Sequence, residues 1–551
     1  MSHMEPTSAP PTLRLSGALS RALSGEVLRS IESRDLARFL FSCRWFGGKG
    51  REAVAVRIAE VIPLEWGDGD QAAVVRLVVD GGVGQAASYQ LPLVVREAEM
   101  SGPHAPPTHA VLALVDADGV RGVVFDALHD PRFRAQLGAA LGRGASFAGD
   151  GARWQLEPVG EGAGEIGALP SRVVAGEQSN SSVIYGDHAI FKLFRKLESG
   201  VNPDVEITRF LTTRTAFRHT PELLGELRYH PAPPPGTAGG AADAADIAKD
   251  ADTADIAAAA AGIAADDIAG QPCVGGMLSR FVSDATDGWA YALADINRYL
   301  SSRSDGGAPP GSFVADAARL GAITRELHEA LASDHTDPAF APVPITSADV
   351  DRWADNARAM VGTALDLLGA RLPALHAKVA PMARAIAGRR AAALALFDEV
   401  ARAARVEESL ATHPIRIRTH GDYHLGQLLH ASDDRWFVID FEGEPARALA
   451  ERRELGSPAR DVAGMLRSFA YAAATGAAHA GGLGVSPATE IHAAHWERDS
   501  RAAFLSEYGA EPDDPLIALF EMEKLFYELE YELNNRPDWV WVPLRGIARL
   551  F

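Results

Sequence analysis

The chain has 551 residues, which is too long for a single hydrophobic core and predicts roughly two to four subdomains. Its net charge of −20 argues against nucleic acid or an anionic membrane as a partner, because both bind basic patches. The only cysteines, Cys43 and Cys273, are too few for a disulfide framework or a thiolate zinc site, and no apolar run is long enough to span a membrane. Because the N-terminal stretch also lacks the pattern of a secretory signal, we expect a cytoplasmic protein.

The first third of the chain predicts two small modules of helices and strands. Residues 13–43 carry leucine, valine and phenylalanine at helical spacing. Residues 54–95 change to β-branched runs that glycine and aspartate turns interrupt, which predicts strands. Further strand and helix signals follow the proline-rich stretch 101–109, so we interpret residues 106–175 as a second module.

A strand lysine follows these modules. Two strand-like runs flank the turn Gly186-Asp187, which predicts a hairpin, and Lys192 lies between bulky residues in its second strand. Kinases use such a lysine to bind the α and β phosphates of ATP and to pair with a helix glutamate. Glu206 is the candidate partner, on a helix that we expect to begin after the cap residue Asn202. The competing interpretation of Lys192 is a solvated edge residue.

Small polar residues precede this hairpin in the stretch 178-QSNSS-182. Their side chains and backbone N–H groups suit a phosphate group. Ser179, Asn180 and Ser181 are therefore candidate nucleotide contacts. Further on, residues 231–270 form an alanine-rich insertion with a thin apolar face, for which we expect weak packing.

The stretches 420-HGDYHLGQ-427 and 438-VIDFEGEP-445 carry the clearest chemistry. An apolar run ends at Asp440, which predicts a short buried strand with this carboxylate at its tip. Two carboxylates and an amide, placed on a loop and on the next strand, can orient a hydroxyl and hold Mg²⁺ beside a nucleotide. Asp422 is the candidate base, and Gln427 and Asp440 are the candidate Mg²⁺ ligands. The competing interpretation is a pair of ordinary turns around a strand.

The order of these motifs resembles the aminoglycoside phosphotransferase-like branch of the protein-kinase superfamily. The strings EQSNSSV, KLFR, GVNPDVE, HGDYHLGQLL and WFVIDFEGEP are similar to the maltokinases and their actinobacterial glucosamine kinase relatives. The resemblance implies an α+β, bilobal protein-kinase-like fold with an N-terminal cap subdomain and a largely helical C-lobe. We expect the cap over residues 1–105, the nucleotide-binding N-lobe over 106–283, including the insertion 231–270, and the C-lobe over 284–551.

The resemblance also implies roles for residues that no spacing could place. The backbone of Arg280 and Val282 would bond adenine at a hinge. Asp461 can cap a helix, and in kinase relatives an aspartate at this place braces the catalytic loop. The helical residues 312–335 and 346–411 are interpreted as scaffold, and His328 as a packing or surface residue.

An acceptor sugar is expected near the terminal stretch 519–547. Glu528 and Glu532 lie on one stripe of the predicted helix, and Tyr531 lies on the neighbouring stripe. Carboxylates accept bonds from sugar hydroxyls, and aromatic rings stack on sugar rings. The competing interpretations are a solvated acidic face beside a core face and, for the loop carboxylates, salt-bridge partners. The candidate sugar contacts are His424, Glu442, Glu444, Glu528, Tyr531, Glu532 and Trp541.

Together these patterns predict an ATP- and Mg²⁺-dependent sugar kinase. Glucosamine, converted to glucosamine 6-phosphate, is the first candidate acceptor, because the glutamate-rich terminal helix favours a protonated amine. HGDY in place of the more typical HGDL also departs from the maltokinase pattern. A maltokinase that forms maltose 1-phosphate is the alternative, and a pseudokinase-like binding module is the alternative of another class. We expect a monomer or weak homodimer with a small sugar substrate and with neither nucleic acid nor a membrane as partner.

Overall fold

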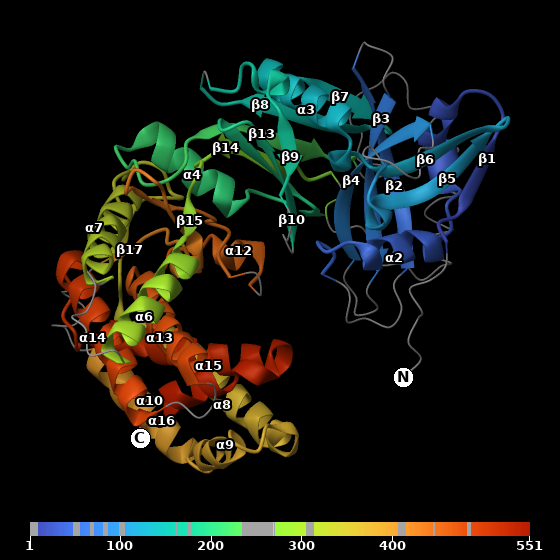
Figure 1. Ribbon diagram of the computed structural model, residues 1–551. Helices are drawn as coiled ribbons and strands as arrows, with labels where there is room; N and C mark the ends of the chain where they lie inside the picture. Colours follow the sequence, from blue (N-terminus) through green and yellow to red (C-terminus); the bar gives the residue numbers. More distant parts are fainter. Residues whose placement is uncertain are drawn as a thin grey trace. The chain divides into compact units, whose positions relative to one another are not determined.

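A computed structural model describes most of the chain, and its contacts divide the chain into two compact units (Figure 1). The first unit comprises Met1–Glu206 and Glu222–Ser283, and the second comprises Ile207–Pro221 and Asp284–Phe551. Most of the predicted insertion 231–270 lies outside the described residues. The described residues are 9–47, 55–66, 71–80, 86–97, 105–160, 162–174, 179–233, 268, 270–304, 313–405, 415–444, 447–481 and 486–550.

The first unit starts with a seven-stranded sheet in the order β1-β5-β6-β4-β3-β2, with β12 paired to β4. Its strands are β1 (Thr12–Leu15), β2 (Ala55–Glu65), β3 (Gln71–Asp80), β4 (Ala86–Glu97), β5 (Val111–Ala117), β6 (Val120–Asp126) and β12 (Lys196–Leu197). The helical segments η1 (Leu19–Leu23), α1 (Gly25–Arg29), α2 (Ser33–Ser42) and η2 (Thr108–Ala110) accompany it. The predicted strands over residues 54–95 are confirmed. The predicted end of the cap at residue 105 falls inside this sheet, since β5 and β6 follow it.

The helical prediction for residues 13–43 is confirmed in α2 and wrong at its start. Residues Thr12–Leu15 form β1, which pairs in parallel with β5. Their exposure alternates along the chain, with Leu13 and Leu15 more buried than Thr12 and Arg14. This period of two is the strand signature, and the helical spacing of the following leucines obscured it in so short a segment.

A second seven-stranded sheet follows in the order β7-β8-β13-β14-β11-β10-β9. The predicted hairpin is confirmed, because β10 and β11 pair antiparallel around Gly186, whose φ of 52° suits glycine. The strands are β7 (Ser146–Gly149), β8 (Ala152–Pro158), β9 (Ser171–Val173), β10 (Asn180–Tyr185), β11 (Ala189–Phe194), β13 (Leu223–His230) and β14 (Cys273–Arg280), and the helical segments are η3 (Ala127–His129), α3 (Pro131–Arg143), η4 (Ile166–Ala168) and α4 (Pro203–Arg214).

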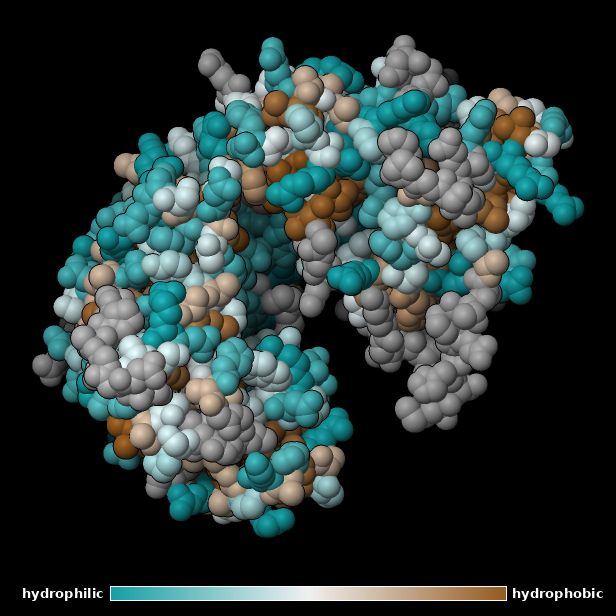
Figure 2. Space-filling model, viewed as in Figure 1, coloured by the Kyte–Doolittle hydropathy of each residue, from teal (hydrophilic) through white to brown (hydrophobic). Residues whose placement is uncertain are grey.

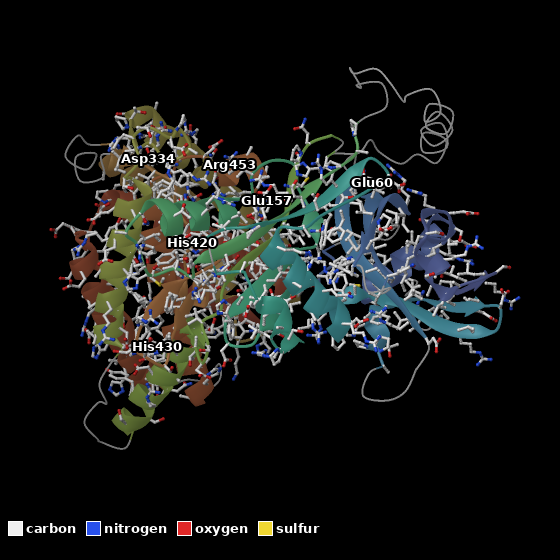
Figure 3. The ribbon with its side chains drawn as sticks, turned by 90° about the horizontal axis from the view of Figure 1, so that it is seen from above. Glu60, Glu157, Asp334, His420, His430 and Arg453 are labelled. Atoms are coloured by element: carbon white, nitrogen blue, oxygen red, sulfur yellow. The ribbon has the colours of Figure 1, made fainter. Side chains whose placement is uncertain are left out.

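A buried carboxylate ties the two sheets together. Glu60 of β2 is 3% exposed and accepts two hydrogen bonds from Arg76 of β3, at 2.8 and 2.9 Å. The hydroxyl of Tyr229 in β13 donates to Glu60 at 2.6 Å, and the backbone N–H of Ala232 donates at 3.0 Å. Figure 3 labels Glu60 within the first unit. Burial and this carboxylate raise the pKa of Tyr229, so the hydroxyl keeps its proton and goes on donating.

The second unit is mainly helical, as predicted for residues 312–335 and 346–411. Its helices are α6 (Gly288–Ser304), α7 (Val314–Leu331), α8 (Ser347–Arg371), α9 (Ala380–Ala387), α10 (Arg390–Ala404), α12 (Leu449–Arg452), α13 (Ala459–Gly481), α14 (Pro487–Tyr508), α15 (Pro515–Asn535) and α16 (Trp541–Ala548). Its shorter elements are η5 (Leu372–Ala374), η6 (Leu425–Gln427), η8 (Pro537–Trp539), β15 (Thr286–Asp287), β16 (Val343–Pro344), β17 (Ile415–Arg416), β18 (Leu428–His430) and β19 (Trp436–Val438).

The termini of these helices follow the local sequence. The side chain of Asn202 accepts hydrogen bonds from the N–H groups of Asp204 and Val205, which confirms it as the cap of α4. Asp514 caps α15 in the same way, with Pro515 in the first helical turn. No helix within the described ranges is both long and apolar enough to cross a membrane.

Helix α13 forms the centre of the second unit and packs against α6, α14, α15 and α16. Most of its residues are buried, so it is apolar nearly all round, as expected of a core helix. The face of this unit that Figure 2 shows is mainly hydrophilic. In agreement with that view, Ile491 and Tyr531 are the large hydrophobic side chains exposed among its described residues.

Small residues let α13 approach its neighbours closely, and Gly464 provides a test. A Cβ atom there would lie 2.5 Å from the carbonyl oxygen of Tyr423. We expect Gly464→Ala to destabilise the protein by about 1–3 kcal/mol, because backbone rather than a flexible side chain must move. Gly369→Ala in α8 is the matched control, since nothing lies within 4 Å of its new methyl group. Thermal unfolding should show a lower Tm for the first variant and an equal or higher Tm for the second, and equal Tm values would contradict this packing.

Candidate active site

One buried carboxylate holds the loop that carries Asp422. Asp461 lies in the first turn of α13 and accepts hydrogen bonds from the backbone N–H groups of His420 at 2.8 Å and Gly421 at 2.9 Å. The ring of His328 in α7 contacts the same carboxylate at 3.2 Å. The predicted brace is confirmed. His328 is buried, as its interpretation as a packing residue predicts, and its ring also completes the brace.

The charge of Asp461 is fixed by the same contacts. Burial acts to raise its pKa, but the hydrogen bonds from His328 and from the N–H of Gly421 hold the pKa below its usual range. Asp461 is 1% exposed, so solvent cannot take over these bonds. An ionised carboxylate of this kind makes stronger hydrogen bonds than a neutral acceptor would.

A short hairpin brings Asp440 next to this loop. Strand β19 is fully buried and pairs with β18, which confirms the strand predicted before Asp440. The N–H of Ile439 donates to the carbonyl of Gln427 at 3.0 Å, and the carbonyl of Ile439 contacts the His420 ring at 3.0 Å. Asp440 itself has a φ of 67°, a left-handed conformation that aspartate tolerates better than most residues. The backbone therefore turns sharply where the predicted metal ligand lies.

Lys524 of α15 contacts the candidate base. Its Nζ lies 3.1 Å from Oδ1 of Asp422 and 2.9 Å from Oε1 of Glu444. Burial alone would lower the pKa of Lys524, but the two carboxylates outweigh this and raise the pKa above its ordinary value. Lys524 is therefore a fixed positive charge that holds one oxygen of Asp422.

Glu444 is a structural carboxylate in this arrangement. It is 8% exposed and also accepts a hydrogen bond from Arg447 at 2.8 Å. Burial acts to raise its pKa, but Lys524, Arg447 and Arg460 lower the pKa to about 2. Its predicted role as a sugar contact stays a prediction, while its other proposed role, as a salt-bridge partner of the loop, is confirmed.

His424 lies beside the other oxygen of Asp422. Its Nδ1 accepts a hydrogen bond from the N–H of Gly426 at 3.0 Å, so a neutral ring carries its proton on Nε2. That nitrogen lies 3.8 Å from Oδ2 of Asp422, which is beyond hydrogen-bond distance. Burial lowers the pKa of His424, which favours the neutral form. This geometry keeps His424 available to a ligand as a donor.

Arginines already neutralise the glutamates of the terminal helix. Arg467 of α13 makes a two-nitrogen contact with Glu528, at 3.2 and 2.8 Å. Glu532 is 1% exposed and accepts hydrogen bonds from Arg536 and from the hydroxyl of Tyr471. The idea that these side chains attract a protonated amine loses its basis, because their charge is already matched inside the unit.

The aromatic candidates on the same segment differ in exposure. Tyr531 is 42% exposed and stacks on Tyr527, with ring centroids 6.4 Å apart. Trp541 is 7% exposed, lies in the first turn of α16 and belongs to the hydrophobic core. Arg545 covers one face of its ring, at 5.0 Å from the centroid. A sugar can therefore reach Tyr531 more readily than Trp541.

The candidate nucleotide residues lie in the first unit. Nζ of Lys192 in β11 forms an ion pair with Asp204 of α4 at 3.1 Å, two residues before the predicted partner Glu206. Strand pairing sets Asn180 on the same face as Lys192, and Ser181 on the opposite face. The hydroxyl of Ser181 accepts a hydrogen bond from Arg195 on that face, so this side chain points away from Lys192.

The predicted hinge residues differ in what their backbones can offer. The N–H of Arg280 donates to the carbonyl of Glu222 at 2.8 Å and is therefore already used. The backbone of Val282 makes no hydrogen bond to any residue that the structure describes. Val282 is the better candidate for adenine. Gln178, the first residue of the predicted phosphate loop, lies outside the described ranges, and Ser179 follows as an exposed residue.

Two hard oxygen donors are candidate ligands for a magnesium ion. Asp440 and Gln427 are both partly exposed, and the hydrogen bond between Ile439 and Gln427 ties their segments together. Carboxylate and amide oxygens are the ligands that Mg²⁺ prefers. Glu442 follows two residues later, and its backbone carbonyl accepts a hydrogen bond from Arg452 at 3.3 Å.

The sequence interpretation missed Lys524, His328 and Arg467. Lys524 is the only basic residue between Pro515 and Asn535, in a helix that is otherwise rich in glutamate. A lone cation in an acidic stripe is a signal for ion pairing, and it could have been noticed. Nothing in the local sequence connects His328 or Arg467 to partners more than sixty residues away.

Comparison with known proteins finds similarity to one domain model and to two glucosamine kinases. Residues 39–130 match the maltokinase N-terminal cap domain. The chain is 27% identical to a glucosamine kinase of Streptacidiphilus jiangxiensis over 289 residues, which are 50% of this chain and 57% of that protein. It is 26% identical to a glucosamine kinase of Mycolicibacterium smegmatis over 401 residues, which are 70% of this chain and 80% of that protein.

Solved structures agree with the fold. A glucosamine kinase in crystal form B has a TM-score of 0.58 at 21% identity, over 95% of this chain and 98% of that chain. A glucosamine kinase in complex with glucosamine, ADP and inorganic phosphate has a TM-score of 0.57 at 22% identity, over 96% and 98% of the two chains. The expected α+β, bilobal kinase-like fold with an N-terminal cap and the expected resemblance are both confirmed.

The ion pairs of Glu444 predict a specific dependence of stability on pH. Its pKa is about 2 in the folded protein, against about 4.3 in an unfolded chain. A lowered carboxylate pKa contributes stability above the unfolded value, and that contribution is lost as the pH falls toward 2. We expect Glu444→Gln to lower stability by about 3 kcal/mol at pH 7, with the difference shrinking below about pH 4.

Thermal unfolding of both proteins at several pH values measures this effect. Glu329→Gln in α7 is the control, because Glu329 is 70% exposed and its ion pair with Arg325 spans 3.9 Å. A difference between wild type and Glu444→Gln that stays constant from pH 7 to pH 3 would rule out the ionic contribution.

Proposed function

We propose that the protein is an ATP-dependent sugar kinase that phosphorylates glucosamine to glucosamine 6-phosphate. One observation carries the proposal: the loop with Asp422 and the strand end with Asp440 are hydrogen-bonded side by side through Ile439. The two glucosamine kinase relatives support the acceptor. The related structure that contains glucosamine, ADP and inorganic phosphate supports ATP as the phosphoryl donor.

The residues have separable roles in this reaction. The acceptor hydroxyl forms a bond to the γ-phosphorus, the bond between this phosphorus and the β,γ-bridging oxygen breaks, and ADP leaves. Asp422 accepts the hydroxyl proton through the oxygen that Lys524 does not hold. Lys192 neutralises charge on the nucleotide phosphates, as a strand lysine does in kinases. Asp440 and Gln427 would hold Mg²⁺, which supplies further neutralisation of phosphate charge when bound.

The acceptor amine needs a partner other than the terminal glutamates. Glu528 and Glu532 are paired within the helical unit. His424 and Tyr531 offer exposed polar atoms, and they remain our candidates for sugar contact along with Glu442. A cytoplasmic location completes the proposal, supported by two buried cysteines that are both free thiols.

A maltokinase that forms maltose 1-phosphate is the second candidate, because residues 39–130 match the maltokinase cap domain. An assay of ATP consumption with glucosamine, maltose and glucose separates the two. We expect turnover with glucosamine and little with maltose. Turnover with maltose alone would reverse the order of the candidates, and no turnover with any sugar would favour the pseudokinase-like module.

Asp422→Asn tests the base. The substitution keeps the shape of the side chain and one acceptor for Lys524 but removes the carboxylate that takes the proton. We expect kcat to fall by at least ~10²-fold, while ATP binding is retained. Steady-state kinetics with nucleotide-binding titration measures both quantities. Full turnover in this variant would remove Asp422 from the mechanism.

Lys524→Met tests whether the lysine positions the base. Without its charge, Asp422 loses the contact at 3.1 Å that fixes its carboxylate. We expect kcat to fall by about tenfold, with the KM for ATP unchanged, because misplacing a catalytic group costs rate. Glu521→Gln is the matched control, since it breaks an ion pair of α15 with Arg501 of similar exposure but away from Asp422. Equal losses in both variants would indicate a general effect on the helix instead.

A further inference from the structure

A cavity in the first unit lies behind the nucleotide sheet. Its volume is about 550 Å³, and its wall comes from the end of α2, from η2, from the junction of β6 with η3, and from the start of β10. It lies on the face of the sheet that carries Ser181, opposite the face that carries Lys192. The volume falls in the range of small-molecule sites.

The polar part of the wall is basic in a chain with a net charge of −20. Arg44, Arg195, His109 and His129 line the cavity, and Asp126 is the one carboxylate among the lining residues that the structure describes. Asp126 already accepts a hydrogen bond from Arg195 at 2.5 Å. The lining therefore has more cationic and donor groups than its own carboxylate can match.

Arg195 is held rigidly in this wall. It is 1% exposed, its guanidinium lies 4.8 Å from the ring centroid of Trp45, and its Nε donates to Ser181 at 2.9 Å. Its Nη1 is buried and has no acceptor among the residues that the structure describes. Buried N–H groups are nearly always paired, so a missing acceptor calls for an explanation. Because Nη1 has almost no accessible surface, an anionic oxygen in the cavity would reach it only after a small shift of the Arg195 side chain.

The other walls suit a carbon skeleton next to that anion. Trp45, Leu128 and Val173 give the cavity an apolar side. Ser181 adds a hydroxyl at the start of β10, and Asn180 borders the cavity beside it. The rings of His109 and His129 stand edge to face, with centroids 5.4 Å apart, and offer further donors. The combination fits a phosphorylated sugar better than a bare ion or an uncharged sugar.

We propose that this cavity binds a phosphate monoester of a small sugar, with Arg44, Arg195 and the two histidines around the phosphate group. Such a ligand would also contact the first residues of β10, which belong to the predicted phosphate stretch 178–182. The binding does not depend on the proposed kinase activity. An effect of the bound ligand on ATP turnover would rest on that proposed activity.

Calorimetric titration of the full chain with glucose 6-phosphate tests the proposal, with saturating ADP present so that the nucleotide site is occupied. We expect glucose 6-phosphate to bind, glucose not to bind, and inorganic phosphate to bind more weakly. Arg44→Ala should weaken binding about tenfold, because a charge-assisted hydrogen bond is lost from an exposed residue whose removal spares the fold.

Two further variants make the result specific. His109→Gln should also weaken binding, while Arg14→Ala, which removes an exposed arginine of β1 that does not line the cavity, should leave it unchanged. No binding of glucose 6-phosphate, equal binding of inorganic phosphate, or full affinity in both cavity variants would overturn the proposal. Binding without kinase activity would count against the proposed function alone, and kinase activity without binding would count against this inference alone.

Discussion

The buried carboxylate of Asp461 is the contact on which the candidate active site depends. It takes the N–H groups of His420 and Gly421 and the ring of His328, and so connects the loop with α7 and α13. The His420 ring then contacts the carbonyl of Ile439, one residue before Asp440. A chain of hydrogen bonds thus runs from one core helix to the base loop and on to the end of β19. Because these links are buried or partly buried, the geometry of the loop follows mainly from the core.

Charge pairing is the second constraint on this unit. The acidic face of α15 is matched by cations from other helices and loops, such as Arg467 for Glu528 and Arg460 for Glu523. Lys524 reverses the pattern, because it is the cation of α15 and its partners are Asp422 and Glu444. A stripe that reads as an acidic surface in the sequence is therefore a set of internal ion pairs. Buried charges tolerate this environment only when they are paired.

Local patterns predicted those parts of the fold whose signals are local. The hairpin around Gly186, the strand before Asp440 and the cap at Asn202 each depend on a few neighbouring residues, and all three are confirmed. The strand β1 was missed because its four residues adjoin a longer helical pattern. The predicted end of the cap at residue 105 falls inside the first sheet, because strands β5 and β6 follow that residue. Strand order is set by pairing between distant segments, and no local pattern predicts it.

By itself the sequence determined the chemistry of the candidate site: a carboxylate loop, a carboxylate at a strand end and a strand lysine, in an order that resembles sugar kinases. Only the tertiary structure decided which side chains surround them. In the structure, Lys524 pairs with Asp422, Asp204 pairs with Lys192, and Arg467 pairs with Glu528. The physical reason is that hydrogen bonds and ion pairs form between groups close in space, and most of these partners are far apart along the chain. Motifs record residue types in order, whereas burial and pairing depend on how distant helices pack.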